Sequence, residues 1–370
     1  MPPELRPVLK AALTPLWLDD RTLRLGTHPA ASLTYRLGPG YRPLIDNLDG
    51  ARDLDQLLDH VKRLGLDRAE AMGMLEQLAR DGALDDAAQP RPADRPLHQY
   101  QLPHQRPASA KPPTAMGPGR TTADLAALGL RHRLPGGGQR AWERRSQRAV
   151  QVNGLGRVGT AIARALAACG VGTVVPVDTN SVGQSDLSPG GYRPKDLGRR
   201  RQDATCEALR DLSPEVNAVG SGYRPWWDLV VVAPADRHPV DILVELTREG
   251  TAHLLVETWP DRAALGPLVI PDRSPCTHCR DLARTESDPA WPMVLAQLGR
   301  VDRPGARNGD TLLSSLVAAQ AALHVLSYLD GGTPPSVNGF LEYPLPLGEP
   351  VHSDLSFHPA CGCAALPLVF

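Results

Sequence analysis

The sequence lacks a surplus of charge of either sign, since 40 Lys and Arg residues stand against 41 Asp and Glu residues, a formal net charge of −1. It therefore provides no overall field that would favour nucleic acid or a membrane surface. We find no apolar run that approaches the roughly 20 residues needed to span a bilayer, and no signal peptide at the start. We expect a cytoplasmic protein with neither a membrane nor a nucleic-acid partner.

Proline and glycine are abundant, with 37 and 34 of the 370 residues. This composition predicts long connections and at least one linker. The length predicts two domains. The six cysteines should stay reduced in the cytoplasm, so metal binding or core packing is favoured over disulfides.

Residues 1–87 have the pattern of a small self-contained domain. Short strands are predicted at 15–18 and 32–37, followed by amphipathic helices over 53–64 and 67–81, the second capped by Asp67 and ended by Gly82. This content is typical of a winged-helix-like α+β domain. Such a domain binds DNA through a helix, binds a peptide as an added strand at a sheet edge, or packs against another subunit. The acids that accompany its basic residues disfavour DNA.

Residues 88–148 are predicted to be a proline-rich linker, because eight prolines lie between positions 90 and 118. At most one docked helical turn is expected in it, at 125–130. Its end, the basic run 140–148, leads directly into the next strand. That run is either a solvated lead-in or the source of an arginine for a phosphate, possible also across a dimer.

From residue 149 the pattern changes to alternating strands and helices, which predicts an α/β, Rossmann-like domain with a mostly parallel sheet over 149–370. The first strand runs into a glycine turn with Gly154, Gly156 and Gly159. A helix over 160–169 and a strand over 171–177 follow, and the strand ends in Asp178.

This order of elements is typical of a nucleotide site. The first glycine permits a tight turn, the second lets the backbone approach a phosphate, and the third lets the helix pack close to the strand. A phosphate would then lie at the positive end of the helix, and Asp178 would bind the ribose. The alternative is a tightly packed strand–helix turn that binds nothing.

Further polar residues follow at strand ends. The segment 192–201 carries four arginines and a lysine, which either hold phosphates or solvate the start of a helix. A buried strand over 228–232 delivers Asp236, and we expect this side chain to face the pocket. Later elements are predicted in one series: a helix at 240–248, a strand at 253–257, a long apolar helix at 312–329, and strands at 339–343 and 354–357.

Four of the six cysteines form two close pairs far apart in the sequence: Cys276 with Cys279, and Cys361 with Cys363. Two such pairs typically clip two loops together through one tetrahedral metal ion. Zinc is favoured over an iron–sulfur cluster because no redox motif accompanies them. The second pair has a short spacing, so His278 or His358 could replace a thiolate. A closed site of this kind supports structure and not chemistry. Cys169 and Cys206 are expected in the core.

These features together resemble the ThiF/MoeB family of ubiquitin-like-protein activating enzymes over about residues 150–363. The resemblance is carried by the glycine turn, the downstream acid, the helix LGRRRQDATCEAL and the cysteine pairs. It implies a homodimer in which ATP and Mg²⁺ adenylate the C-terminal carboxylate of a small protein. It also implies that Gly154, Gly156 and Gly159 line the phosphates, that Asp178 binds ribose, and that Cys276, Cys279, Cys361 and Cys363 hold zinc.

The chain departs from the family pattern at catalytic positions. Where the family has Asn-Leu-X-Arg-Gln, this sequence has Asp-Leu-Ser-Pro-Gly from Asp186 onward, so the phosphate-binding arginine is missing. Arg201 stands where the family has a lysine, and an arginine presents its charge with a different geometry. The magnesium-binding acid matches Asp236 only loosely. These differences at Arg201 and Asp236 predict a degenerate adenylation site.

The whole layout is similar to the ThiF-like partner proteins of azole-forming peptide natural-product biosynthesis. That resemblance implies that the N-terminal domain captures the leader of a precursor peptide and delivers it to a separate YcaO-type cyclodehydratase. The alternative is an active adenylyltransferase that acts on a peptide or carrier protein. A nucleotide-binding or redox protein of another kind is a third hypothesis.

Overall fold

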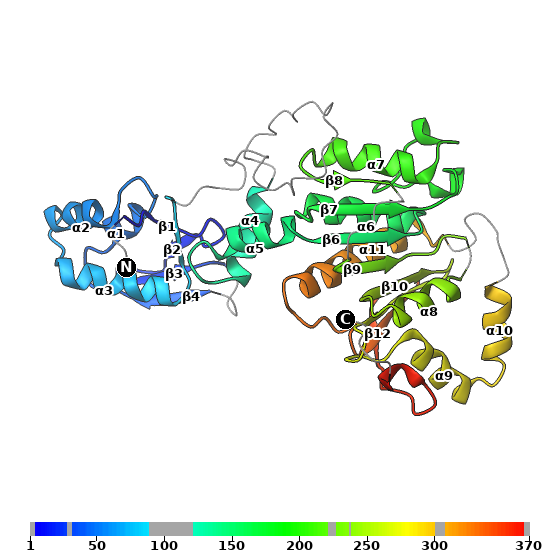
Figure 1. Ribbon diagram of the computed structural model, residues 1–370. Coiled ribbons are helices and arrows are strands. Elements are labelled where there is room, and N and C mark those ends of the chain that lie inside the picture. The colour runs from blue at the N-terminus through cyan, green and yellow to red at the C-terminus, as the bar shows by residue number, and fades with distance from the viewer. Residues whose placement is uncertain are drawn as a thin grey trace. The chain divides into compact units, whose positions relative to one another are not determined.

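The computed structural model describes residues 4–27, 32–88, 121–220, 227–236, 238–299 and 308–365 (Figure 1). The chain divides into two compact units, Met1–Arg144 and Arg145–Phe370. Most of the predicted linker, residues 89–120, lies outside the described residues.

Unit 1 is a small α+β module. Its three-stranded antiparallel sheet has the order β2 (Pro15–Trp17), β3 (Thr22–Leu25), β4 (Leu33–Arg36), and a second pair joins β1 (Pro7–Leu9) to β5 (Leu84–Asp86). The helices are α1 (Arg42–Asp46), α2 (Leu54–Arg63) and α3 (Arg68–Arg80). The strands β1, β3 and β5 were not predicted from the sequence.

Local chemistry explains the two longer helices of this module. Asp53 caps α2 by accepting from the backbone of Gln56, whose side chain bonds back to complete a capping box. Asp67 caps α3 as predicted. Gly82 ends α3 with a φ of 72°, a conformation that favours glycine. Leucines from the inner faces of α2 and α3 pack against β3 in one buried core.

The predicted linker has regular structure in its last third. Helix α4 spans Thr122–Arg131 and α5 spans Gly137–Ser146, and Leu128, Ala141 and Trp142 are buried between them. The predicted single turn at 125–130 is therefore a full helix, and the basic run contributes to a second one. Prolines are absent from both helices, so nothing in the sequence prevented them from forming.

Unit 2 is built on one eight-stranded sheet of order β13-β12-β11-β10-β9-β6-β7-β8. The strands are β6 (Ala149–Asn153), β7 (Thr173–Val177), β8 (Asn217–Ala218), β9 (Leu229–Val232), β10 (His253–Thr258), β11 (Arg262–Val269), β12 (Gly339–Pro344) and β13 (Val351–Asp354). Pairing from β10 through β8 is parallel, and β11 to β13 add an antiparallel edge. The predicted α/β class with a mostly parallel sheet is confirmed.

Helices cover both faces of this sheet (Figure 1). On one face α6 (Arg157–Ala168), α7 (Arg201–Leu212) and α11 (Thr311–Leu329) join the main core, and on the other α8 (Val240–Arg248) packs on a smaller cluster. Strand β9 shows the reason in its sequence: Leu229 and Val231 contact the first layer, while Val230 and Val232 contact the second. Continuous apolar runs are typical of strands buried on both faces.

Two strand predictions near the end of unit 2 need correction. The strand expected at 354–357 is β13 at Val351–Asp354, and β11 was not predicted at all. β13 is largely exposed at the sheet edge, so its residues carry no apolar pattern. β11 follows β10 through a tight turn, and it contains Gly266 and Pro267, which are uncommon inside a strand.

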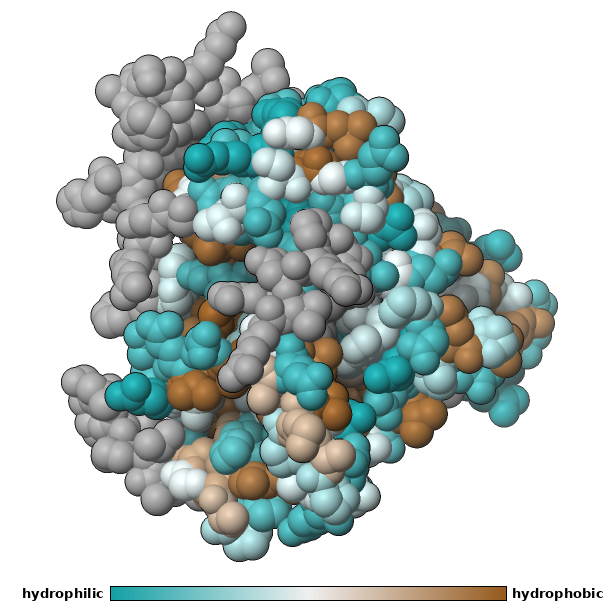
Figure 2. Space-filling model, turned by 90° about the vertical axis from the view of Figure 1, so that its right-hand side faces the viewer, coloured by the Kyte–Doolittle hydropathy of each residue, from teal (hydrophilic) through white to brown (hydrophobic). Residues whose placement is uncertain are grey.

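The sequence prediction that no apolar run could span a bilayer was wrong for helix α11. Its 19 residues are long and apolar enough to cross a membrane, by length and composition alone. Yet 56% of its most apolar window is buried inside the fold, where Val317, Ala321 and Val325 contact the sheet. Hydrophobic residues on the face in Figure 2 lie in separate groups among hydrophilic ones. We assign α11 to the core of unit 2.

Candidate functional site

The glycine turn between β6 and α6 is as tight as the sequence predicted. Gly154 has a φ of 86°, and a Cβ there would lie 2.2 Å from the carbonyl oxygen of Ala233. A Cβ on Gly159 would lie 1.8 Å from the oxygen of Gly154, and one on Gly156 would lie 2.5 Å from the Cβ of Ala235. Packing within the protein therefore already demands all three glycines, whether or not a phosphate binds.

Asp178 lies at the end of β7, beside this turn. Its carboxylate accepts from the backbone N–H of Leu155 at 2.7 Å and from that of Asn180 at 2.9 Å. The acid that the resemblance assigns to ribose thus binds a backbone N–H of the glycine turn itself. Asp178 also faces the guanidinium of Arg201 at 3.2 Å.

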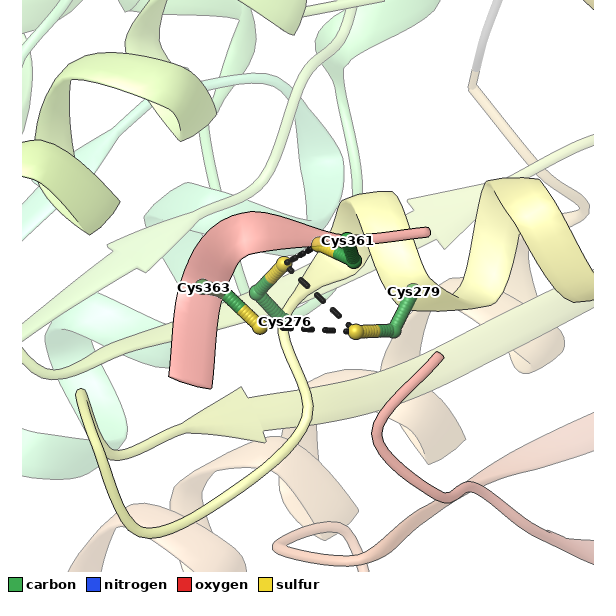
Figure 3. Close-up of side chains that lie close together, drawn as sticks. All are labelled: Cys276, Cys279, Cys361 and Cys363. Carbon is green, nitrogen blue, oxygen red and sulfur yellow. Dashed lines mark hydrogen bonds between the residues drawn. The ribbon is translucent and has the colours of Figure 1, made fainter. Parts of the chain in front are cut away.

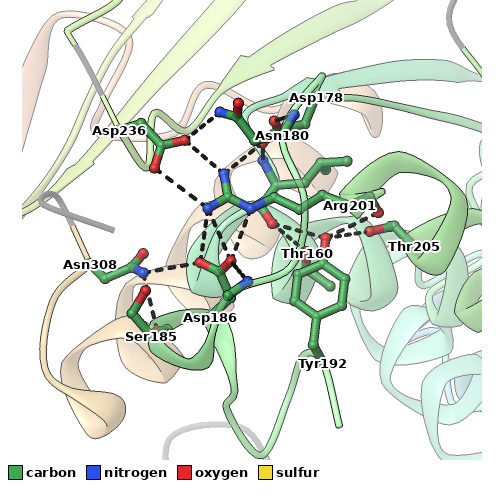
Figure 4. Close-up of polar contacts among 12 residues, drawn as sticks. Thr160, Asp178, Asn180, Ser185, Asp186, Tyr192, Arg201, Thr205, Asp236 and Asn308 are labelled. Carbon is green, nitrogen blue, oxygen red and sulfur yellow. Dashed lines mark hydrogen bonds and ion pairs between the residues drawn. The ribbon is translucent and has the colours of Figure 1, made fainter. Parts of the chain in front are cut away.

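Arg201, at the start of α7, is the centre of a buried ion cluster (Figure 4). Its Nη1 donates to Asp236 at 2.7 Å, and its Nε and Nη2 donate to the two oxygens of Asp186 at 3.0 and 3.1 Å. The bonds to Asp178 and, at 3.5 Å, to the second oxygen of Asp236 complete the set. An arginine has five N–H donors. Arg201 uses all five on three carboxylates.

Two of the carboxylates also accept hydrogen bonds from residues other than Arg201. Asn180 donates to Asp236 at 2.8 Å, and Asn308, just before α11, donates to Asp186 at 3.1 Å. The hydroxyl of the buried Tyr192 can donate to either of two backbone oxygens beneath the cluster, that of Leu155 at 2.9 Å or that of Arg201 at 3.1 Å. Every charged group in the cluster is therefore satisfied inside the protein, which a buried charge requires.

The cluster keeps Arg201 charged although it is almost fully buried. Burial alone lowers the pKa of this guanidinium, but the hydrogen bond to Asp236 and the charges of Asp178 and Asp186 raise its pKa above the ordinary value. One positive and three negative groups leave a net charge of −2. In this arrangement Arg201 has no N–H free to give to a nucleotide phosphate.

The structure thus brings three sequence-predicted residues together: Asp178, Arg201 and Asp236. Their roles toward a ligand stay predictions. Asp186 was noticed only as a departure from a family motif, and Asn180 and Asn308 were missed. Asn308 lies 122 residues from its partner Asp186, so no local spacing could have connected them.

The four predicted metal ligands also converge (Figure 3). The Sγ atoms of Cys276 and Cys361 lie 3.6 Å apart, those of Cys279 and Cys363 lie 3.4 Å apart, and all four lie within 4.8 Å of one another. Four thiolates about 2.3 Å from a zinc ion would be separated by about 3.8 Å at the edges of a tetrahedron. The donor set and its spacing therefore fit one metal ion.

The protein builds this centre from two segments. Cys276 is the N-cap of α9 (Thr277–Ser287), and Cys279 lies in its first turn, while the other pair flanks Gly362 near the end of the chain. Burial raises the pKa of Cys276 and raises that of Cys363 to about 11, so metal coordination would have to displace protons from them. His278 is exposed, and the ring of His358 pairs with Glu286 at 3.0 Å. Neither imidazole is needed as a ligand.

The other two cysteines lie apart from this centre. Cys206 is buried within α7, and Cys169 is half-buried at the end of α6, where it packs against the main core. Both lie where core packing was expected.

Comparison with known proteins finds a family match over part of the chain. Residues 131–236 match the model of the ThiF family. A 75-residue stretch is 29% identical to ubiquitin-like modifier-activating enzyme 5 of Arabidopsis thaliana; it covers 20% of this chain and only 17% of that protein.

Solved structures show the same fold over nearly the whole chain. E. coli MccB with AMPCPP and MccA has a TM-score of 0.66 at 13% identity, and covers 97% of this chain and 99% of its own. E. coli MccB with ATP has a TM-score of 0.63 at 12% identity, over 96% and 99% of the two chains. PaaA has a TM-score of 0.66 at 15% identity, over 94% and 100%. At 12–15% identity, these likenesses show a shared fold.

Proposed function

We propose that this ThiF-domain protein captures the leader of a precursor peptide through unit 1 and delivers it, in the cytoplasm, to a YcaO-type cyclodehydratase. The single observation that carries the proposal is an open strand edge in unit 1. Strand β4 is the last strand of its sheet, with β3 as its only neighbour among the described residues.

Hydrogen-bond alternation shows which groups of β4 are open. Leu37 donates to the oxygen of Arg21 across the β3–β4 ladder, which places residues 33, 35 and 37 on the bonded side. Bonding alternates along an antiparallel strand, so Thr34 and Arg36 direct their N–H and C=O groups outward. An extended peptide can pair with these groups as an added strand. The opposite edge is less suited, because Pro15 of β2 has no N–H.

The side chains beside the open edge supply a surface for recognition. Leu33 and Tyr35 face the core side of the sheet but remain only half-buried, since no further strand covers them. The hydroxyl of Tyr35 donates to Asp81 at the end of α3 at 2.8 Å, which fixes the ring between sheet and helix. Alternate side chains of an added peptide would contact these two residues.

A solved relative supports a polypeptide ligand. MccB was crystallised with MccA, which carries selenomethionine in one structure and an N-formyl group in another and is therefore a polypeptide. Those chains and this one share a fold across both units, at 12–13% identity.

Replacing Thr34 by proline should abolish peptide binding and leave the fold intact. Proline removes the outward N–H that the peptide would need, while an edge strand tolerates the residue. The measurement is fluorescence anisotropy of a labelled candidate leader peptide, taken from a short reading frame near this gene and titrated with the full chain. Thr34→Val, which keeps the N–H, is the matched control and should bind like the wild type. Equal affinity of the proline and valine variants would contradict strand addition at β4.

We further propose that the adenylation site is degenerate. Support comes from the saturated donors of Arg201, the internal bond of Asp178 to the glycine turn, and the net charge of the cluster. The second candidate function, an active adenylyltransferase, is favoured by the MccB structure with ATP.

Pyrophosphate exchange separates the two functions. We expect no ATP-dependent exchange with Mg²⁺ and the peptide, and no shift of the melting temperature with ATP and Mg²⁺, because a ligand that does not bind cannot stabilise. Exchange that is lost in Asp236→Ala would establish the adenylyltransferase instead.

A homodimer is the oligomer that we propose, and helix α11 offers its surface. Leu312, Leu316 and Leu323 lie on one side of α11 and are 78, 37 and 47% exposed. Leu347 is 77% exposed, and the neighbouring Gly348 lies against Leu316. The helix has no charged residue between 311 and 329. A second copy could cover this stripe in a two-fold arrangement.

Replacing Leu316 by aspartate should then convert the dimer to a monomer in light scattering, since a charge would be buried without a partner. Met293→Asp is the control, because Met293 is also exposed, at 69%, but lies on α10 (Trp291–Leu298). A wild-type monomer, or dissociation of both variants alike, would count against this surface.

A further inference from the structure

A small cavity opens on unit 2 outside the sites described so far. Its volume is about 260 Å³, and it lies between α6, α7 and the turn that precedes the 3-10 helix Pro194–Asp196. Three charged side chains line it: Arg164 from α6, Arg193 from the turn, and Asp211 from α7. Pro189, Gly191 and Leu212 complete the walls.

The side chains of the two arginines of this cavity have no partner among the described residues, unlike those of two neighbouring arginines. Arg199 pairs with Glu207 at 2.6 Å, and Arg210 donates to the backbone of Ala218 at 2.6 Å. Within the described residues, the side chains of Arg164 and Arg193 form neither an ion pair nor a hydrogen bond. Two arginines from separate elements thus line the cavity with no side-chain partner in the described part of the chain.

The turn that carries Arg193 is firmly anchored. Tyr192 is buried and its hydroxyl bonds to three partners, including Thr205 at 2.9 Å. Gly191 donates to the oxygen of Ser188 at 3.1 Å. The hydroxyl of Ser188 is itself buried without a partner, 2.6 Å from where a Cβ on Gly191 would lie. The backbone of this turn is therefore fixed, while the side chain of Arg193 is exposed and can reach a ligand.

We propose that this cavity binds a peptide carboxylate, from an acidic side chain or a C-terminus, together with an adjacent N–H group. Two arginines and one aspartate give a local charge of +1, which matches a single carboxylate. Guanidiniums bind carboxylates through paired hydrogen bonds. Asp211 provides an acceptor for the N–H, and it disfavours phosphate, which carries more negative charge. The assignment depends only on residues of unit 2 and is separate from the strand edge of unit 1.

The test uses the full chain and three probes in calorimetric titrations: N-acetylglutamate N-methylamide, acetate and inorganic phosphate. We expect the first to bind most tightly, with a Kd of about 1 mM, because so small a ligand makes few contacts. Arg164→Ala and Arg193→Ala should each weaken it about ten-fold, the effect of a lost charge-assisted hydrogen bond. Arg200→Ala, an exposed arginine that does not line the cavity, is the matched control and should bind as the wild type does.

The variant Asp211→Asn distinguishes a site for a peptide carboxylate from a site for any simple anion. It should weaken the glutamate derivative and strengthen phosphate, because it removes a negative charge and the best acceptor together. The proposal is overturned if no probe binds saturably, if phosphate binds the wild type more tightly than the peptide probe does, or if both arginine variants bind like Arg200→Ala. Circular dichroism should show all of these surface variants folded.

Discussion

Replacing Cys276 by serine should lower the free energy of unfolding of unit 2 by about 4 kcal/mol or more, the range reached when a structural metal is lost. The four thiols lie within 4.8 Å of one another and join the start of α9 to the chain end. Without a metal ion, burial favours the neutral thiol of Cys276, and nothing else described there links the two segments covalently. Because metal binding contributes directly to folding, its loss appears as lost stability.

Denaturant unfolding and elemental analysis would test this together. Purified protein should hold about one zinc ion per chain. A chelator should destabilise the wild type to the level of Cys276→Ser and leave that variant unchanged. Cys169→Ser is the matched control, since Cys169 lies outside the centre, and should cost less than about 1 kcal/mol. Metal-free wild-type protein of full stability would refute a structural metal.

Replacing Arg201 by alanine should lower the free energy of unfolding of unit 2 by about 3–5 kcal/mol, the usual cost of removing one partner from a buried ion pair. The alanine would leave the carboxylates of Asp178, Asp186 and Asp236 buried without their shared cation. Arg201→Lys keeps the charge but offers three donors in place of five, so we expect an intermediate loss.

Arg199→Ala is the control that shows how much of the loss in unfolding free energy depends on the burial of the ion pair. Arg199 adjoins the 3-10 turn and pairs with Asp196 and Glu207, but its side chain is 37% exposed. Surface pairs contribute no more than about 1 kcal/mol. Equal losses from Arg199→Ala and Arg201→Ala in urea unfolding would show that the cluster does not hold the domain together.

Several elements could be predicted from the sequence because their signals are local. Asp67 and Gly82 mark the ends of α3, and the helix predicted at 240–248 coincides with α8. The continuous apolar run of β9 indicated a strand buried on both faces. Edge strands were harder to predict. Strand β13 is exposed, and its residues follow no apolar alternation.

The sequence predicted which residues belong to the candidate site but not how they pair. Residue spacing marked Asp178, Arg201 and Asp236 individually, but each was assigned to a nucleotide. Their mutual pairing depends on the parallel order β9-β6-β7, which places the carboxyl ends of separate strands side by side. No pattern along the chain indicates that three carboxylates accept from all the N–H donors of Arg201 that a phosphate would need.

The sequence by itself determined the alternation that makes unit 2 an α/β sheet, the glycines that its turn requires, and the two cysteine pairs, because these depend on neighbours along the chain. The sequence predicted that the four thiols meet, and the tertiary structure brings them together; it alone decided that β4 is left as an open edge and that three aspartates share Arg201. Those contacts join residues between 15 and 85 positions apart, and the energy of such contacts depends on distances that only the folded chain sets.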